Sequence, residues 1–278
     1  MEQLAGRVAV VTGGGDGIGR ALSLTLAAEG MDLVIADIRL ERASAVAEEA
    51  RTLGRRALPV AVDVGDRASV EALADAAYAE FGAVQVLCNN AGVVGVSPLT
   101  AVEDANWRWL IQVNLWGVVY GLQTFLPRML DAGQEGHVVN TASSAGLYPG
   151  GSGRQGAYVA SKYAVVGMTE ALAAELEGSP IGATVLCPTA TRTDIFHNAF
   201  VGRPDTYGGP RPSRGTLADF EARGDVLPEM MDPMLLARRV VRAIRERRRY
   251  VVGDTSEVRA NVRDRLQRIL DDCDWNEE

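Results

Sequence analysis

The chain has 278 residues, of which 47% are hydrophobic and 23% are charged, and its formal net charge at pH 7 is −8. This composition is typical of a globular protein with a sizeable core. The net negative charge argues against nucleic acid or an anionic membrane as a partner. No apolar run reaches the roughly 18 residues that a membrane span needs. The first residues lack the plan of a signal peptide, so we expect a cytoplasmic protein.

Metal and thiol chemistry find little support in the sequence. The three cysteines, Cys88, Cys187 and Cys273, lie far apart and match no zinc or redox spacing. The two histidines, His137 and His197, are too few for a multi-histidine metal site. We therefore predict no metal site, and we interpret Cys88 and Cys187 as small buried residues of apolar strands.

Short apolar runs alternate with longer amphipathic stretches along the chain, which is the pattern of βαβ units. Strands are expected at residues 7–12, 32–37, 57–62, 84–89, 136–141, 181–187 and 250–252. Helices are expected at 17–29, 41–53, 67–81, 103–130, 157–177, 233–247 and 257–270. The predicted fold class is α/β, a single-domain Rossmann-type doubly wound parallel sheet of about seven strands with helices on both faces.

Residues 192–233 interrupt this alternation. The segment holds several prolines and glycines and scattered aromatic residues, without a strong period. Long segments of this kind inside a compact domain are usually functional lids or disordered excursions. We predict one domain over residues 1–278 that carries a lid-like insertion at about 192–233.

A glycine-rich turn follows the first predicted strand and opens a helix. Glycines here allow a tight turn and a close approach to a pyrophosphate, and the helix N-terminus offers it free N–H groups. The residues predicted to bind a dinucleotide in this turn are Gly13, Gly15, Asp16, Gly17 and Ile18.

An acidic residue, Asp37, ends the second predicted strand about 20 positions later, as the dinucleotide-binding pattern requires. Its carboxylate can bind both ribose hydroxyls and would repel a 2′-phosphate, so we predict NAD as the cofactor. Arg39 lies two residues further on and keeps NADP as the less favoured alternative.

Lys162 is the single lysine among the 28 basic residues. A position that keeps lysine in an arginine-rich chain is a candidate for a role that needs a compact ammonium rather than a planar guanidinium. Tyr158 precedes it by four residues, so both side chains would lie on one face of a helix.

Three motifs together resemble those of the short-chain dehydrogenase/reductase family. They are Thr-Gly-(three residues)-Gly-Ile-Gly at 12–19, Asn-Asn-Ala-Gly at 89–92 and Tyr-Val-Ala-Ser-Lys at 158–162, in the order in which the family has them. The resemblance implies an oxidoreductase that acts on CH–OH groups with a nicotinamide cofactor.

The resemblance implies catalytic roles for Tyr158 and Lys162. Tyr158 would be the general acid/base that exchanges a proton with the substrate oxygen. A free tyrosine has a pKa of about 10 and is a poor base at neutral pH. The Lys162 ammonium and the positive nicotinamide ring favour the phenolate, so we expect them to lower this pKa. Lys162 would also bind the nicotinamide ribose.

Two further catalytic positions are implied by the resemblance. Ser143 matches the serine that hydrogen-bonds the reacting oxygen. The loop between this serine and Tyr158 is longer than the family usually has, so Ser144 is kept as an alternative. Asn114 matches the helix asparagine that holds a water in the proton relay of the family.

The resemblance also assigns contacts to the cofactor. The residues expected against the adenosine are Asp63, Val64 and Asn90. Those expected against the nicotinamide are Thr191 and Thr193, together with Tyr158 and Lys162. Thr189 stands where the family has a glycine, which leaves the local backbone open.

The predicted reaction is the NAD-dependent interconversion of a secondary alcohol and a ketone. The side chains expected to wall the substrate site are Val94, Tyr148, Phe196, Phe200 and Tyr207. They favour an apolar or aromatic alcohol or ketone as the small-molecule partner. The resemblance further implies a homotetramer or homodimer built on the helices at 103–130 and 157–177.

Two alternatives remain. A catalytically retired dehydrogenase fold could act as a binding or regulatory protein, since fold does not determine function. The arginine cluster within 238–249 is its best support, although cations at a helix C-terminus are also favoured by the helix dipole. The second alternative is an epimerase or dehydratase of the extended branch, against which the glycine spacing and the Asn-Asn-Ala-Gly motif both argue.

Overall fold

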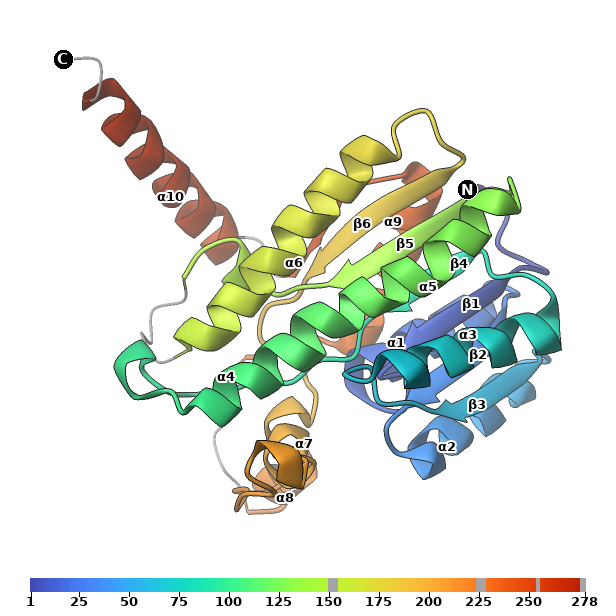
Figure 1. Cartoon of the computed structure of the whole chain (residues 1–278), viewed down its shortest axis with the longest axis horizontal. Coiled ribbons are helices and arrows are strands. Elements are labelled where there is room, and N and C mark those ends of the chain that lie inside the picture. The colour runs from blue at the N-terminus through green and yellow to red at the C-terminus, as the bar shows by residue number, and fades with distance from the viewer. Residues whose placement is uncertain (150–154, 224–228, 254–255, 276–278) are drawn as a thin grey trace.

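One parallel sheet organises the molecule (Figure 1). The computed structural model describes residues 1–149, 155–223, 229–253 and 256–275. Its seven strands pair in the order β3-β2-β1-β4-β5-β6-β7, all parallel. They are β1 (Val8–Thr12), β2 (Asp32–Asp37), β3 (Ala57–Ala61), β4 (Val86–Asn89), β5 (Gly136–Thr141), β6 (Ile181–Cys187) and β7 (Tyr250–Val252). The predicted Rossmann-type doubly wound sheet is therefore confirmed.

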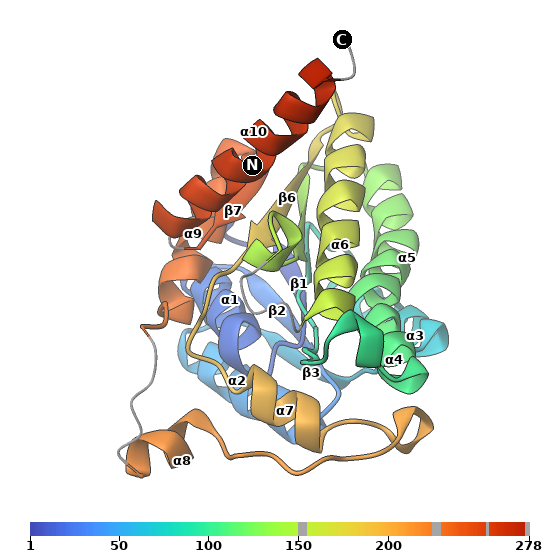
Figure 2. The same ribbon diagram turned by 90° about the vertical axis from the view of Figure 1, so that its left-hand side faces the viewer.

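Helices connect the strands and cover both faces of the sheet (Figure 2). The α-helices are α1 (Gly17–Ala28), α2 (Leu40–Thr52), α3 (Arg67–Phe81), α4 (Asp104–Ile111), α5 (Gly117–Asp131), α6 (Gly156–Glu175), α7 (Ile195–Val201), α8 (Leu217–Ala222), α9 (Pro233–Glu246) and α10 (Ser256–Trp275). Short turns of 3₁₀-helix lie at η1 (Leu99–Ala101), η3 (Ser144–Gly146) and η4 (Asp205–Tyr207), and η2 (Gln112–Trp116) is a π-helix.

Two apolar layers hold the helices to the sheet. On one face α1, α2 and α9 pack together, with Leu22 and Leu236 buried against the strands. On the other face α3, α5 and α6 pack against the strands, with Leu73 and Phe125 buried in the core. Strands buried on both faces read as continuous apolar runs, which is why their positions are visible in the sequence.

The sequence-based helix at 103–130 differs from the structure in one respect. It consists of α4 and α5 joined by the π-helix η2, which contains Asn114. A π-helical turn inside a longer helix is common at functional sites. The apolar period of the sequence continues through it and therefore does not reveal it.

The strand order reverses beside β1, because β2 and β4 lie on its two sides. In open parallel sheets the crevice at such a switch point, outside the carboxyl ends of the strands, is where ligands bind. The glycine-rich turn follows β1, the segment 89–92 follows β4, and Ser143 follows β5. The three lie at this one edge of the sheet.

The segment 192–233 contains α7, η4 and α8. Residues 224–228 of this segment, and residues 150–154 of the loop before α6, lie outside the described residues. Thr191 forms a bridge with Met231, so the two ends of the segment meet beside β6.

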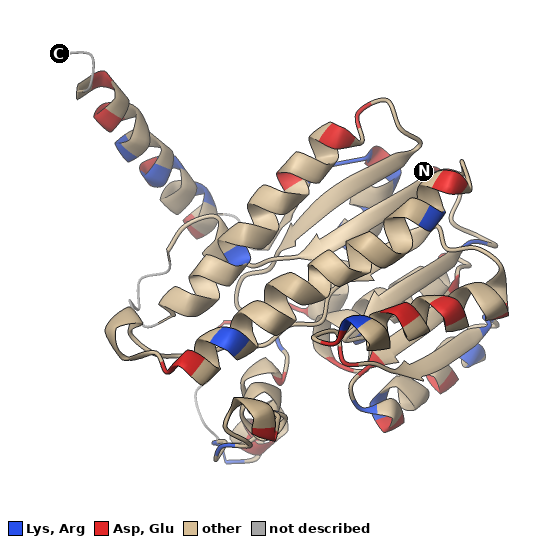
Figure 3. Ribbon diagram, viewed as in Figure 1, with Lys and Arg blue, Asp and Glu red and all other residues tan. Residues whose placement is uncertain are grey.

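Most of the arginines of the cluster within 238–249 contact acidic residues or backbone carbonyl groups. Arg245 forms an ion pair with Glu29 on α1, while Arg242 and Arg248 both pair with Glu246. Arg247 donates to the carbonyl group of Ser179. Figure 3 shows blue and red segments intermixed over the molecule. The cluster is thus an ion-paired helix end.

The cysteine and histidine residues on the strands of the sheet are buried in the core. Cys88 and Cys187 are fully buried. His137 lies with its Nε2 2.7 Å from the Thr184 hydroxyl. Within the described ranges, no group of three or more metal-ligating side chains is found. None of the described helices is long and apolar enough to cross a membrane.

Candidate active site

A cavity of about 730 Å³ lies at the carboxyl edge of the sheet, within the size range of small-molecule and cofactor sites. Its walls contain nearly all the side chains singled out in the sequence. The predicted residues that line it are Gly13, Asp16, Gly17, Ile18, Asp37, Asp63, Val64, Asn90, Ser143, Tyr158, Lys162, Thr191 and Thr193. Two predicted residues, Gly15 and Asn114, lie behind this wall.

The glycine-rich turn leaves no room for side chains. Gly17 has φ of +51°, a conformation that favours glycine. A Cβ at Gly19 would lie 1.9 Å from the carbonyl oxygen of Gly13. Asp16 caps α1 by accepting a hydrogen bond from the N–H of Gly17 at 2.7 Å. The turn therefore forms a glycine cradle at a helix N-terminus, which is suited to a pyrophosphate.

Asp37 is held at the base of the cavity beside this turn. Its side chain is buried, and each of its oxygens accepts a backbone hydrogen bond at 3.0 Å, one from Gly15 and one from Arg39. The N–H of Gly15 is thereby used inside the protein, and this glycine does not line the cavity. The carboxylate is oriented by the backbone and faces the cavity in a defined position.

The cavity wall continues with Asn90, which follows β4, and with Asp63 and Val64, which follow β3. Asn90 donates to the carbonyl oxygen of Thr12 at 3.0 Å and so joins the turns after β1 and β4. Asp63 accepts from the N–H of Gly65 at 2.8 Å. Val64 packs against Gly117 at the start of α5. All three hold loop backbone in place as well as lining the cavity.

The segment after β6 brings two threonines to the cavity. Thr191 donates to the carbonyl oxygen of Thr189 at 2.8 Å, and Thr193 packs directly over Gly17. A Cβ at Gly253 would lie 2.5 Å from Thr189. The threonine at position 189 is therefore accommodated by a glycine after β7.

Ser143 and Tyr158 meet at the opposite end of the cavity. Their hydroxyls are hydrogen-bonded to each other. Ser144 also lines the cavity, but its N–H donates to the carbonyl oxygen of Pro188, and it begins the short helix η3. The geometry thus brings Ser143, the residue preferred from the sequence, to the tyrosine hydroxyl.

The pKa of Tyr158 responds to two features of this position. Burial raises it, because the phenolate loses solvation, and the hydrogen bond from Ser143 lowers it. The net direction among the protein's own groups is upward, and the lowering expected from the sequence includes the positive ring of a bound nicotinamide. The Lys162 ammonium lies 5.8 Å from the centre of the Tyr158 ring.

Lys162 is almost completely buried on the same helix. Its ammonium donates to the carbonyl oxygen of Thr141 at 3.0 Å, which ties α6 to the end of β5. Burial lowers the pKa of Lys162 to about 8. The residue is therefore still mostly charged at neutral pH, and it loses this charge at a moderately alkaline pH.

Asn114 is fully buried in η2, and its side chain exchanges hydrogen bonds with the backbone of Val93, at 2.8 and 2.9 Å. It also donates to the hydroxyl of Ser161 at 3.1 Å. Asn114 thus connects the π-helix, the segment after β4 and α6. The geometry places it one layer behind the tyrosine and the lysine.

A family model described as short chain dehydrogenase matches residues 7–203. The chain belongs to the short-chain dehydrogenase/reductase family. A dehydrogenase of 1-deoxy-11-beta-hydroxypentalenate from Streptomyces avermitilis is 40% identical over 200 residues, which are 71% of this chain and 73% of the relative. The 3beta-hydroxysteroid dehydrogenase 2 of Eggerthella lenta is 36% identical over 193 residues, 69% of this chain and 74% of that protein.

A solved structure extends the likeness over nearly the whole chain. The crystal structure of a short-chain dehydrogenase/reductase from Burkholderia phymatum in complex with NAD has a TM-score of 0.87 and 36% sequence identity. It covers 97% of this chain, and this chain covers 96% of it. This chain is thus an oxidoreductase of the family, and NAD binding is observed in a homologous structure.

In this family member, the substrate end of the cavity is walled mainly by apolar side chains. Of the residues expected there, Val94, Tyr148, Phe196 and Tyr207 line the cavity. Phe200 does not, and its side chain is exposed. Its neighbour Ala199 is buried and lines the cavity, so α7 is rotated such that the Phe200 side chain is turned away from it.

Several residues of the cavity were not visible in the sequence. The additional lining residues include Arg42, Trp109, Gln112, Ile195 and Asn198. Asn198 lies 159 positions from Arg39, to which it is hydrogen-bonded. Such a contact has no local sequence signal, because it depends on how the insertion folds back over the cavity.

Proposed function

We propose that this family member interconverts a secondary alcohol and a ketone, with NAD as the preferred cofactor. The observation that carries the proposal is the joining of two sites in one cavity. Ser143, Tyr158 and Lys162 converge at one end, and the glycine cradle with Asp37 forms the other.

The cofactor end fits a dinucleotide with free ribose hydroxyls. The glycine turn offers backbone where a Cβ would collide, and the N-terminus of α1 points to the same place. Asp37 would accept hydrogen bonds from the ribose and repel a 2′-phosphate. Val64, Asp63 and Asn90 would hold the adenosine. When bound, the cofactor supplies or accepts the hydride.

At the other end of the cavity, side chains of the protein would transfer the proton. The Tyr158 hydroxyl would give its proton to a carbonyl oxygen during reduction, and the Tyr158 phenolate would take the proton from a carbinol during oxidation. The Ser143 hydroxyl would hydrogen-bond the same oxygen and stabilise the phenolate. Because burial raises the pKa of Tyr158, the phenolate needs added positive charge, which the Lys162 ammonium provides from the same face of α6.

Asn114 would act as a positioning residue. Its side chain fixes the backbone of Val93 and the Ser161 hydroxyl, and both lie next to the catalytic residues in sequence or space. Thr191 and Thr193 would contact the nicotinamide from the segment after β6.

The substrate would be apolar or aromatic. The side chains at the substrate end are Val94, Trp109, Tyr148, Phe196 and Tyr207. The insertion at about 192–233 would act as a lid of the single domain, because α7 supplies part of this wall. Two relatives are named for alcohols on larger carbon skeletons, a hydroxypentalenate and a hydroxysteroid, whereas a third is named for the polyol D-threitol.

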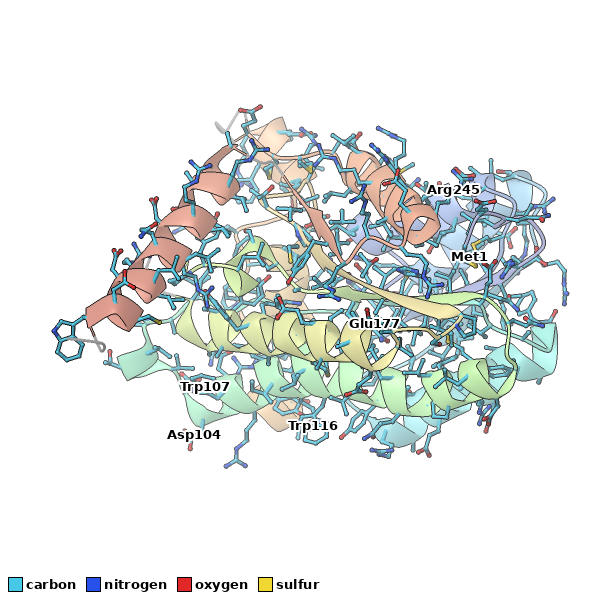
Figure 4. The ribbon with its side chains drawn as sticks, turned by 90° about the horizontal axis from the view of Figure 1, so that it is seen from above. Met1, Asp104, Trp107, Trp116, Glu177 and Arg245 are labelled. Atoms are coloured by element: carbon cyan, nitrogen blue, oxygen red, sulfur yellow. The ribbon has the colours of Figure 1, made fainter. Side chains whose placement is uncertain are left out.

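We further propose a homodimer or homotetramer. The outer face of α6 presents the small residues Ala160, Gly167, Ala171 and Ala174 to solvent, and a Cβ at Gly167 would meet open space. In Figure 3 both α5 and α6 show long uncharged stretches, and Figure 4 shows Trp116 on the outer side of its helix. Light scattering on the purified protein tests this, and a monomer would contradict it.

The function is tested by titrating the protein with NADH and NADPH and then screening alcohols with NAD and ketones with NADH. We expect tighter binding of NADH and turnover of bulky apolar secondary alcohols. A clear preference for small charged substrates would overturn the substrate class. Binding of neither cofactor would overturn the proposed activity.

A further inference from the structure

Three side chains, those of Asp16, Arg42 and Asn198, form a closed hydrogen-bonded ring at the adenosine end of the cavity, and a fourth, Arg39, is hydrogen-bonded to Asn198. Asp16 caps α1, Arg39 precedes α2, Arg42 lies in its first turn, and Asn198 lies on α7 of the insertion. All four line the cavity. We call this set the Asn198 ring.

Asn198 holds the ring together with both ends of its amide. Its oxygen accepts from Arg39 at 2.8 Å and from Arg42 at 3.2 Å. Its nitrogen donates to the Asp16 carboxylate at 2.9 Å, and the same carboxylate oxygen forms an ion pair with Arg42 at 2.9 Å. One neutral side chain thus engages two cations and one anion.

The two guanidiniums are crowded where they meet the amide oxygen. Burial lowers the pKa of Arg39, and the neighbouring charge of Arg42 lowers it further, while Asp37 and Asp16 oppose this change. Cations that converge on one neutral oxygen would gain from a dianion in its place. The position beside Asp37 is where a 2′-phosphate on the adenosine ribose would come.

We propose that Asn198 is a specificity residue for the cofactor, which keeps Arg39 and Arg42 from binding a 2′-phosphate. With the amide in place, one nitrogen of Arg39 is directed to Asn198, one nitrogen of Arg42 is directed to Asn198 and Asp16, and Asp37 faces the ribose. Without the amide, Arg39 loses its side-chain partner and Arg42 keeps only Asp16, so both guanidiniums can turn to a phosphate. This inference rests on the proposed preference for NAD.

A pair of substitutions tests the proposal with opposite expected signs. Asn198→Ala removes the acceptor and releases the arginines. Asn198→Asp keeps an acceptor for them, but adds a negative charge that repels both Asp16 and a 2′-phosphate. A merely structural role of Asn198 would weaken the binding of every cofactor in both variants, without changing the preference.

The measurement is the dissociation constant of 5′-ADP and of 2′,5′-ADP, which probe the adenosine end without the nicotinamide, followed by NADH and NADPH. For Asn198→Ala we expect the affinity ratio to shift about tenfold toward the 2′-phosphorylated ligands, as one recovered charge-assisted hydrogen bond would give. For Asn198→Asp we expect a shift in the opposite direction. Phe200→Ala, on the exposed side of the same helix, is the matched control and should leave the ratio unchanged.

The outcomes separate the two proposals. If the unmodified protein binds NADH but neither Asn198 variant changes the ratio, the Asn198 ring does not set cofactor choice, and the proposed function stands. If the unmodified protein binds neither cofactor, the proposed function fails and the specificity role fails with it. Equal loss of both ligands in both variants assigns Asn198 a structural role and also overturns the proposal.

Discussion

The two ends of the cavity are built in different ways. At the catalytic end, Lys162 and Asn114 are buried, and both are hydrogen-bonded to the backbone of neighbouring elements. At the adenosine end Asp37 is likewise held by the backbone, but the Asn198 ring is joined by contacts between side chains, and Arg42 and Asp16 keep about a third of their side-chain surface exposed. Backbone anchors leave few alternative arrangements, whereas a ring of side chains can be rebuilt by changing one of them.

This difference indicates that the two ends of the cavity serve different functions. Proton transfer needs groups placed to within a fraction of an ångström, which rigid elements supply. Selection between related cofactors needs only a change in local charge, which half-exposed side chains supply. Substitutions at the catalytic end should therefore lower turnover, and substitutions at the adenosine end should change which cofactor is bound.

The largest effect is expected for Tyr158→Phe. Removal of the hydroxyl deletes the general acid/base, so turnover should fall about 10³-fold while NADH affinity stays within a small factor. Steady-state kinetics with a substrate from the screen measures this. Tyr163→Phe, on the same helix, is the control and should keep its activity. Substantial turnover by the Tyr158 variant would remove this residue from the mechanism.

A smaller loss, about 10²-fold in turnover, is expected for Lys162→Arg, because a planar guanidinium must occupy a site shaped for an ammonium. The pH dependence of NADH binding provides a second test of the role of Lys162. Lys162 is charged below its pKa of about 8 and neutral above it, so NADH affinity of the unmodified protein should decline as the pH rises through 8.

The arginine variant stays charged over this range, so its affinity should lose that dependence. Fluorescence titrations of NADH between pH 6 and pH 10 compare the two proteins, with the range chosen as about two units on each side of the expected midpoint. A decline that persists in the variant would show that another group titrates.

Ser143→Ala and Ser144→Ala resolve which serine assists the tyrosine. Loss of the hydrogen bond to Tyr158 should reduce turnover about 30-fold in the Ser143 variant. The Ser144 variant keeps its backbone hydrogen bond to Pro188 and should retain most activity. Comparison of kcat between them is sufficient, and a larger loss at Ser144 would reverse the assignment.

The smallest effect is expected for Asp37→Ala at the adenosine end. Loss of two ribose hydrogen bonds should weaken NADH binding about tenfold and relax the discrimination against NADPH. Asp32→Ala, at the opposite end of the same strand β2, is the control. Unchanged NADH affinity in the Asp37 variant would place the ribose elsewhere.

Much of the fold could be predicted because buried parallel strands leave a strong local pattern. The strands at 32–37, 136–141, 181–187 and 250–252 have the predicted bounds. The motif glycines and the tyrosine-lysine spacing are also local, so they are visible as sequence. The π-helix around Asn114 is not, because it changes the backbone hydrogen bonds without changing the apolar period.

Other features depend on tertiary contacts that no local pattern encodes. The Asn198 ring joins helices that are far apart in the chain, and the exposed position of Phe200 depends on how α7 is rotated. The burial that raises the pKa of Tyr158 is likewise not encoded locally, because the depth of burial cannot be judged from neighbouring residues.

The solitary lysine makes the protein convenient to label. Acylating reagents attack neutral amines, and apart from the terminal amine of Met1 the chain offers them only Lys162. A pKa of about 8 gives this amine a reactive fraction under mild conditions, and its near-complete burial makes the reaction depend on entry through the cavity. A peptide-mass measurement that places the added group on Lys162, and not on the terminal amine, would therefore count the cavities that are open to the reagent, before any substrate is known.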